Sequence, residues 1–200
     1  IETQIAFSSE LQQTWSHVLN AAVDASSSGS TPSLASVTVS HTTSGDNRLM
    51  LVGVTTDPHG ESVASVTYNG VNLSLVGVED DSAKHSRVEI WSLVAPGTGT
   101  HDVIVSMTGT SHHGVTVGVM TFTEVDQAAP VLNFAGASGT STTAATTVTS
   151  STDDLVFGVV HSHFGSAATP GAGQTEYWDI TANQSNSSGT IEAGAASVTT

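Results

Sequence analysis

The stretch Ser62-Val-Ala-Ser-Val-Thr-Tyr-Asn-Gly-Val-Asn-Leu-Ser-Leu-Val-Gly-Val78 contains two runs of alternating side chains joined by one dipeptide. That dipeptide, Asn69-Gly70, is typical of a type I′ turn, which needs a positive φ at both of its central residues. Alternation on both sides of such a turn predicts a β-hairpin whose strands each bury one face. Comparable runs, separated by turn residues, recur along the chain. We therefore predict an all-β protein.

The other runs that favour strands are Ile1–Phe7, Leu34–His41, Arg48–Thr55, Arg87–Val94, His101–Met107, Val115–Phe122, Asp154–His161, Gln174–Thr181 and Thr190–Thr200. About twelve strands at a spacing of roughly 8–12 residues predict an antiparallel two-sheet β-sandwich of the jelly-roll or immunoglobulin-like type. Arg48–Thr55 is dense in apolar residues, which favours a central strand. The residues expected in the core are Leu49, Leu51, Val66, Ile90, Val103, Val117 and Val156.

The N-terminal part of the chain differs from the rest. Its first run, Ile1–Phe7, places Ile1, Thr3, Ile5 and Phe7 on one side, as in a half-buried strand. Glu10–Ala25 is compatible with a helix or a strand, and the Ser/Gly/Pro-rich Asp24–Ser33 favours a loop or tether. We therefore expect a strand and tether over residues 1–33 and a sandwich domain over 34–200.

Composition limits the partners and the setting. The chain has 3 basic and 18 acidic residues, a net charge of −15 and no cysteine. Nucleic acid and anionic membrane surfaces are disfavoured as partners, because both require clustered Lys or Arg. No apolar run approaches the roughly 20 residues that a membrane-spanning helix needs. Because the chain opens at Ile1, we interpret its start as a processed or truncated end. Removal of a signal peptide is the favoured explanation, so we expect a secreted protein at the cell surface.

The segment from Ser40 to Gln127 resembles a known type of module. The runs that carry the resemblance are SHTTSGDNRLMLVGV, VTYNGVNL, RVEIWSLVAPGTGT and FTEVDQ. They are similar to a β-sandwich module of bacterial secreted and surface proteins and of some viral structural proteins. The resemblance implies an extracellular structural or adhesive setting, and it brings no catalytic residues with it.

The sequence has no recognisable catalytic motif. G-x-S-x-G, H-E-x-x-H, the P-loop and the dinucleotide fingerprint are all missing from it. We therefore expect a protein that is not an enzyme, with no catalytic residue and no cofactor.

Two groups of residues are weak candidates for metal binding. His161 and His163 are two residues apart at a strand end, so both rings can face the same way and bind Zn²⁺ or Cu²⁺ with one further ligand. Polar residues where the strand enters the following loop are the simpler interpretation of the pair. Asp80 and Asp81 beside Glu79, or Asp57 with Glu61, could provide oxygen ligands for Ca²⁺, but a solvated acidic loop is the simpler interpretation.

Two further features bear on a surface role. Asn72, Asn183 and Asn186 are N-x-S acceptors for glycosylation, and we expect the last two to lie in an exposed loop. The aromatic residues that could stack on a sugar are Trp15, Tyr68, Trp91, Tyr177 and Trp178.

These observations favour a structural protein. We expect a subunit of an extracellular assembly, a filament or pilus-like fibre rather than a virion or surface layer, whose partners are copies of itself. Donation of the Ile1–Phe7 strand to a neighbour would explain how such copies join. The alternative is a secreted carbohydrate-binding or adhesive β-sandwich module, whose partner would be a glycan.

Overall fold

Every regular element in the described part of the computed structural model is a β-strand. The structure describes residues 21–57, 61–83, 85–110, 113–163, 167–195 and, for the backbone alone, 198–199. In chain order the strands are β1 (Ala22–Thr31), β2 (Ser36–Thr43), β3 (Leu49–Thr56), β4 (Val63–Tyr68), β5 (Val71–Asn72), β6 (Ser74–Asp80), β7 (Arg87–Val94), β8 (Gly99–Met107), β9 (Val115–Thr123), β10 (Thr147–Val148), β11 (Leu155–His163), β12 (Thr175–Ala182), β13 (Ser185–Ala193) and β14 (Val198–Thr199). Among these residues no helix has the length and apolar character needed to cross a membrane.

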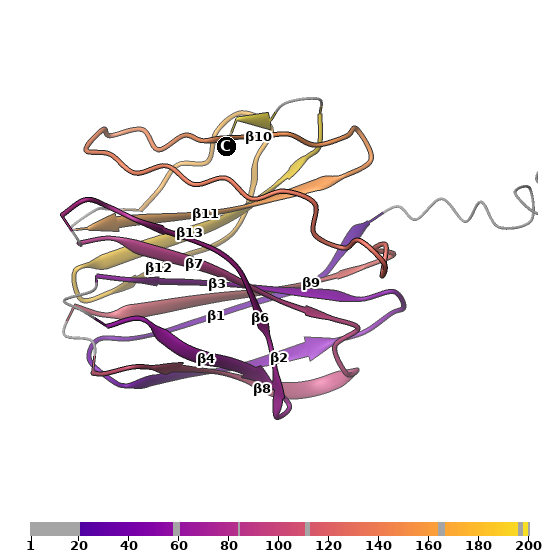
Figure 1. Ribbon diagram of the computed structural model, residues 1–200, viewed down its shortest axis with the longest axis horizontal. Helices are drawn as coiled ribbons and strands as arrows, with labels where there is room; N and C mark the ends of the chain where they lie inside the picture. Colours follow the sequence, from indigo (N-terminus) through magenta and orange to yellow (C-terminus); the bar gives the residue numbers. More distant parts are fainter. Residues whose placement is uncertain are drawn as a thin grey trace, which may run out of the picture.

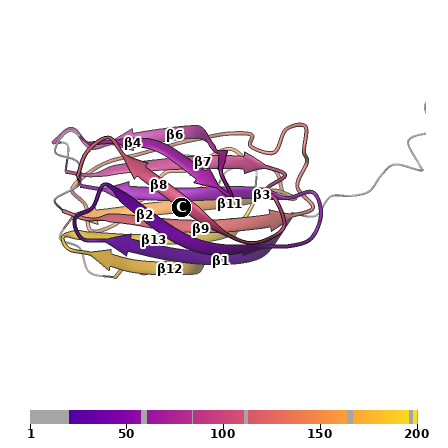
Figure 2. The same ribbon diagram turned by 90° about the horizontal axis from the view of Figure 1, so that it is seen from below.

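The strands form a layered antiparallel sandwich (Figures 1 and 2). A central sheet with the order β1-β9-β3-β7-β6 packs on a lower sheet with the order β2-β8-β4-β5. These two sheets are the predicted sandwich, which is confirmed. A third, upper sheet with the order β11-β13-β12 covers the opposite face of the central sheet, and β10 pairs separately with β14.

The middle strands of the central sheet are buried on both faces. On β3, Met50, Val52 and Val54 face a lower core, which they share with the lower sheet. Leu49 and Leu51 face an upper core, which they share with the upper sheet. A strand covered on both faces needs apolar residues at successive positions, which explains the dense apolar run at 48–55. Of the expected core residues, Leu51 and Ile90 are half-buried and the others are buried.

The Asn69-Gly70 turn has the predicted geometry, but the hairpin is shorter than expected. Asn69 and Gly70 have φ angles of 48° and 77°, both positive as a type I′ turn requires. β4 pairs with the second run at Val71 and Asn72, and Leu73 N–H donates to the Val66 carbonyl at 2.9 Å. The chain then crosses to the central sheet, where β6 pairs with β7. The single strand predicted over Val71–Val78 is therefore two strands in different sheets.

The prediction of a loop or tether at Asp24–Ser33 is wrong over most of that range. Residues 22–31 form β1, which pairs with β9 from Ala22↔Thr123 to Thr31↔Val115. The serine-rich sequence is held there by the neighbouring layers: Ser26 Oγ donates to the Tyr177 carbonyl at 3.4 Å, and Ser27 Oγ lies 3.0 Å from His41 Nδ1. The predicted assembly strand Ile1–Phe7 lies outside the described residues.

Glycines set the close approach of the central and upper sheets at Trp178. A Cβ added to Gly118 or Gly189 would lie 2.2 Å or 2.0 Å from the Trp178 indole. One added to Gly53 would lie 2.7 Å from Val159. The indole is buried in the upper core and tilted against the Phe157 ring at a centroid distance of 5.8 Å. The two sheets can pack around this large ring because Gly53 and Gly118 of the central sheet, and Gly189 paired with Trp178 in the upper sheet, have no side chain.

Candidate metal centre

The upper core ends in a group of polar side chains. The positions of β3 that face the upper sheet are Leu49, Leu51, Gly53 and Thr55, and the next in this alternation is Asp57. On β11 the facing positions are Leu155, Phe157 and Val159, followed by His161 and His163. Both strands finish at the same end of the sandwich, on the left of Figure 1. The Asp57 carboxylate and the His163 ring meet there, across the boundary between the two sheets.

Three imidazole rings surround the Asp57 carboxylate. His163 Nδ1 is 2.9 Å from Asp57 Oδ2, His113 Nδ1 is 3.6 Å from the same oxygen, and His85 Nδ1 is 3.8 Å from Oδ1. His85 comes from the connection between β6 and β7, and His113 lies just before β9. The nearest ligand atoms of Asp57, His85 and His163 all lie within 4.8 Å of one another.

The Asp57 carboxylate is buried without a hydrogen bond. Its side chain has no exposed surface, and neither oxygen has a hydrogen-bond partner in the described part of the chain. Both ring nitrogens of His161 are buried in the same way. Burial is the main cause that lowers the pKa of His161 to about 4, and the charge of His163 lowers it further. The charges of Asp57 and Asp81 act in the opposite direction. A buried carboxylate is costly unless a cation or hydrogen-bond donors compensate for its charge.

This donor set is typical of a site for a transition-metal ion. Imidazole nitrogen and carboxylate oxygen are ligands for Zn²⁺, whereas Ca²⁺ prefers six to eight oxygens. Four ligands at 2.0–2.1 Å in a tetrahedron lie about 3.3 Å from one another. The three nitrogen–oxygen distances around Asp57, 2.9, 3.6 and 3.8 Å, fall on both sides of that value.

The residue spacing revealed only part of this group. His161 and His163 lie on the same face of β11, as their spacing predicts. Asp57, His85 and His113 were not expected beside them. For Asp57 a signal was present, because it continues the alternation of β3, whereas the two loop histidines reach the site only through the register of the central sheet.

Asp80 and Asp81, two of the acidic residues considered for Ca²⁺, already have protein partners. Asp80 binds the Arg87 guanidinium through both oxygens, at 2.9 and 2.8 Å. Asp81 Oδ1 accepts the backbone N–H groups of His85 and Ser86 at 2.7 and 3.0 Å. Asp81 therefore shapes the loop that carries His85.

The aromatic residues do not form one exposed face. Tyr68 is buried in the lower core and Trp178 in the upper core. Trp91 packs against the lower core and Tyr177 against the upper core, both half-buried. Trp15 lies outside the described residues. The four of these Trp and Tyr candidates that the structure describes thus pack in two separate cores.

Two of the three glycosylation candidates are exposed. Asn72 is exposed on β5, and Asn183 is exposed in the turn between β12 and β13. The expectation of an exposed loop is wrong for Asn186, which is buried in β13 and donates to Asp179 Oδ1 at 2.8 Å and Thr181 Oγ1 at 3.1 Å. Modification of Asn72 and Asn183 stays a prediction.

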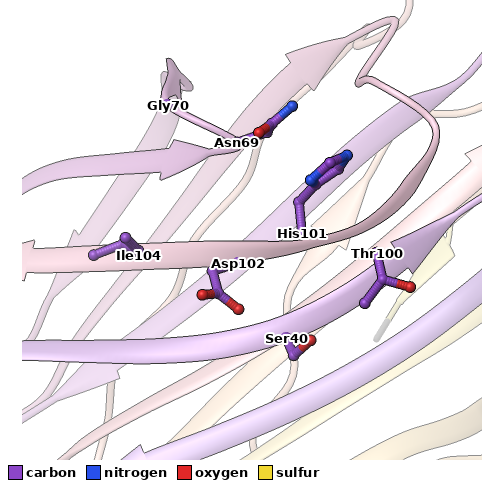
Figure 3. Close-up of a pocket in the computed structure, with 7 residues that line it drawn as sticks. All are labelled: Ser40, Asn69, Gly70, Thr100, His101, Asp102 and Ile104. Carbon is purple, nitrogen blue, oxygen red and sulfur yellow. The ribbon is translucent and has the colours of Figure 1, made fainter.

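A shallow hollow lies on the lower sheet, away from the histidine cluster (Figure 3). Its lining residues are Ser40, Asn69, Gly70, Thr100, His101, Asp102 and Ile104. Most of these side chains are exposed, and His101 is half-buried with its ring edge against Tyr68 at a centroid distance of 5.6 Å. Because solvent reaches these groups, the hollow has none of the desolvated charge found at Asp57.

Comparison with family models, characterised proteins and solved structures gives no match to this chain. The resemblance of the Ser40–Gln127 segment to a secreted or surface module therefore stays a prediction, and the function is argued from the residues themselves.

Proposed function

We propose that this chain is a non-enzymatic structural subunit of an extracellular, pilus-like assembly, in which copies join by strand addition. The observation that carries the proposal is the outer edge of β6. In the described part of the chain β6 pairs with β7 alone. Such an edge presents backbone N–H and C=O groups that an added strand can satisfy.

The side chains of β6 support this role for its edge. Leu75 and Val78 are 48% and 37% exposed, although both are apolar. The adjacent Gly77 lies under the Phe134 ring, which is itself 40% exposed. Edge strands are usually protected by Lys or Pro, and β6 contains neither. An exposed apolar surface along an open edge is typical of an interaction site.

The opposite edge of the central sheet is closed by the chain itself. β1 contacts β2 of the lower sheet and β12 of the upper sheet. The His41 ring of β2 reaches Ser27 of β1, and Ser26 reaches the backbone of β12. The β6 side is therefore the favoured acceptor.

The favoured donor is Ile1–Phe7 of another copy. Its alternation suits a strand that buries Ile1, Thr3, Ile5 and Phe7 against the exposed apolar residues of β6. Residues 8–21 separate it from β1, and a fully extended chain of that length spans roughly 45 Å. That reach is sufficient for contact with a neighbouring subunit. In this proposal the chain is extracellular and its partners are copies of itself. Such an assembly requires neither binding to nucleic acid nor insertion into a membrane.

The carbohydrate-binding alternative gains no comparable support. It depended on a sugar-stacking face, and Tyr68 and Trp178 are inside the two cores. The hollow of Figure 3 offers polar groups but no Trp, Tyr or Phe among its lining residues.

Deletion of residues 1–8 tests the proposal. Sedimentation velocity should show assemblies for the full chain and a folded monomer for the shortened chain. On the acceptor side, Leu75→Lys in β6 should also reduce assembly, because a charge on the edge opposes strand addition. Ile104→Lys is the matched control, since Ile104 is 40% exposed on β8 of the lower sheet. Full assembly by the shortened chain would refute strand donation.

A further inference from the structure

We propose that Asp57, His85 and His163 bind one Zn²⁺ ion, which links the central sheet to the upper sheet, and that the neighbouring His113 ring turns in as the fourth ligand. The site is independent of the proposed assembly. Its ligands come from the end of β3, the two loops before β7 and β9, and the end of β11.

The first argument is the buried charge of Asp57. The described arginines cannot compensate for it, because their groups are engaged elsewhere. Arg87 binds Asp80 and Glu89, and Arg48 donates to the backbone of Gly45 and Pro96. Three imidazole nitrogens instead lie within 3.8 Å of the Asp57 carboxylate, and a neutral imidazole has a lone pair for a metal ion. A divalent cation between them would neutralise the carboxylate, whose burial otherwise leaves its charge uncompensated.

The second argument is that the backbone holds these ligands in place. In the central sheet Thr56 is opposite Arg87 on one side and Val115 on the other, so the residues before β7 and β9 flank Asp57. Asp81 fixes the backbone at His85. The His113 carbonyl accepts bonds from Gln184 N at 3.3 Å and Ser185 Oγ at 3.2 Å, which connects its loop to the upper sheet. Outer contacts of this kind orient ligands in metal sites.

The third argument is the place of the site in the fold. It closes one end of the upper core, where two layers meet and no disulfide can join them, since the chain has no cysteine. An ion bound by both layers would stabilise the folded state, because the unfolded chain does not present the four ligands together. We therefore assign it a structural role.

Calorimetric titration of chelator-treated full-length protein with ZnCl₂ tests the site. We expect about one Zn²⁺ per chain, confirmed by elemental analysis after gel filtration, and no corresponding heat with CaCl₂. Asp57→Asn and His163→Gln should each weaken binding by more than the roughly 10–100-fold typical of lost outer contacts. His101→Gln, which changes a histidine on the lower sheet, should bind as the wild type does.

Thermal unfolding gives a second readout that separates a metal site from a cluster of ion pairs. Zn²⁺ should raise the melting temperature of the wild type and of His101→Gln, but not that of Asp57→Asn. Without metal, Asp57→Asn should be at least as stable as the wild type, because it removes an uncompensated buried charge. The proposal is overturned if wild-type protein binds no Zn²⁺, or if folded His163→Gln and Asp57→Asn both bind it with wild-type affinity.

Discussion

At the scale of single residues, His41 shows how a buried polar side chain joins two layers. Its Nε2 lies 3.1 Å from Thr121 Oγ1, and its Nδ1 lies 3.0 Å from Ser27 Oγ. Thr121 donates its only hydroxyl hydrogen to Asp24 Oδ2 at 2.9 Å. His41 Nε2 must therefore donate to Thr121, and neutral Nδ1 accepts from Ser27. The ring thus connects β2 of the lower sheet to β1 and β9 of the central sheet.

This arrangement predicts a loss of stability in acid. Burial lowers the pKa of His41 below the ordinary 6.5, although the Asp24 carboxylate opposes the shift. The unfolded chain then binds a proton at His41 more readily than the folded chain does. The contribution of neutral His41 to the stability of the fold is therefore present above about pH 6.5 and is lost as the pH falls. Urea unfolding at pH 7.5 and pH 5.5 should show a smaller loss for His41→Gln than for the wild type. Equal losses would show that His41 does not contribute.

Gly118 gives a prediction about packing. A methyl group there would lie 2.2 Å from the Trp178 ring, between two sheets that cannot easily separate. Gly118→Ala should therefore lower the free energy of unfolding by about 1–3 kcal/mol. Gly139→Ala is the control, because nothing lies within 4 Å of an added Cβ there. The measurement is denaturant unfolding, and equal stability of the two variants would contradict the packing described here.

At the scale of elements, alternation predicted most strands but not the ones made of hydroxyl and amide side chains. The predicted Arg87–Val94 strand matches β7, and Val115–Phe122 matches β9 to within one residue. The predicted Thr190–Thr200 strand overlaps only the end of β13. The first half of β13 was missed because Ser185, Asn186, Ser187 and Ser188 are typical of a turn, yet all four are buried. Ser188 bonds Glu176 at 2.8 Å, and Ser185 bonds the His113 carbonyl. These partners are distant in sequence, so no local pattern reveals them.

The same limit applied to the candidate site. The spacing of His161 and His163 was visible within one strand, but His85 and His113 join them only because β7 and β9 flank β3. Strand order follows from the whole fold rather than from any one segment.

The role of Asn186 in the upper sheet can be tested directly. Asn186→Ala would leave Asp179 Oδ1 without this bond in a part-buried position, and should cost about 1–3 kcal/mol. Asn72→Ala, at an exposed position of β5, should change the stability little. Thermal or chemical unfolding of both variants provides the comparison, and a neutral Asn186→Ala would mean that β13 does not depend on this bond.

At the scale of the whole molecule, the neighbouring layers cover one edge of the central sheet and leave the other edge exposed. β1 is closed by strands of both neighbouring layers, whereas β6 carries exposed apolar residues along an open edge. With a net charge of −15, copies of this chain repel one another at long range. Contact between them then depends on short-range pairing and apolar burial, which strand addition provides.

Negative-stain electron microscopy of the purified full chain is the most direct test of self-assembly. We predict particles that contain many copies in a regular repeat, formed at moderate salt, where charge repulsion is screened. Chains without residues 1–8 should give only single small particles under the same conditions. A full chain that stays a 20.3 kDa monomer at every concentration and salt level would contradict the account.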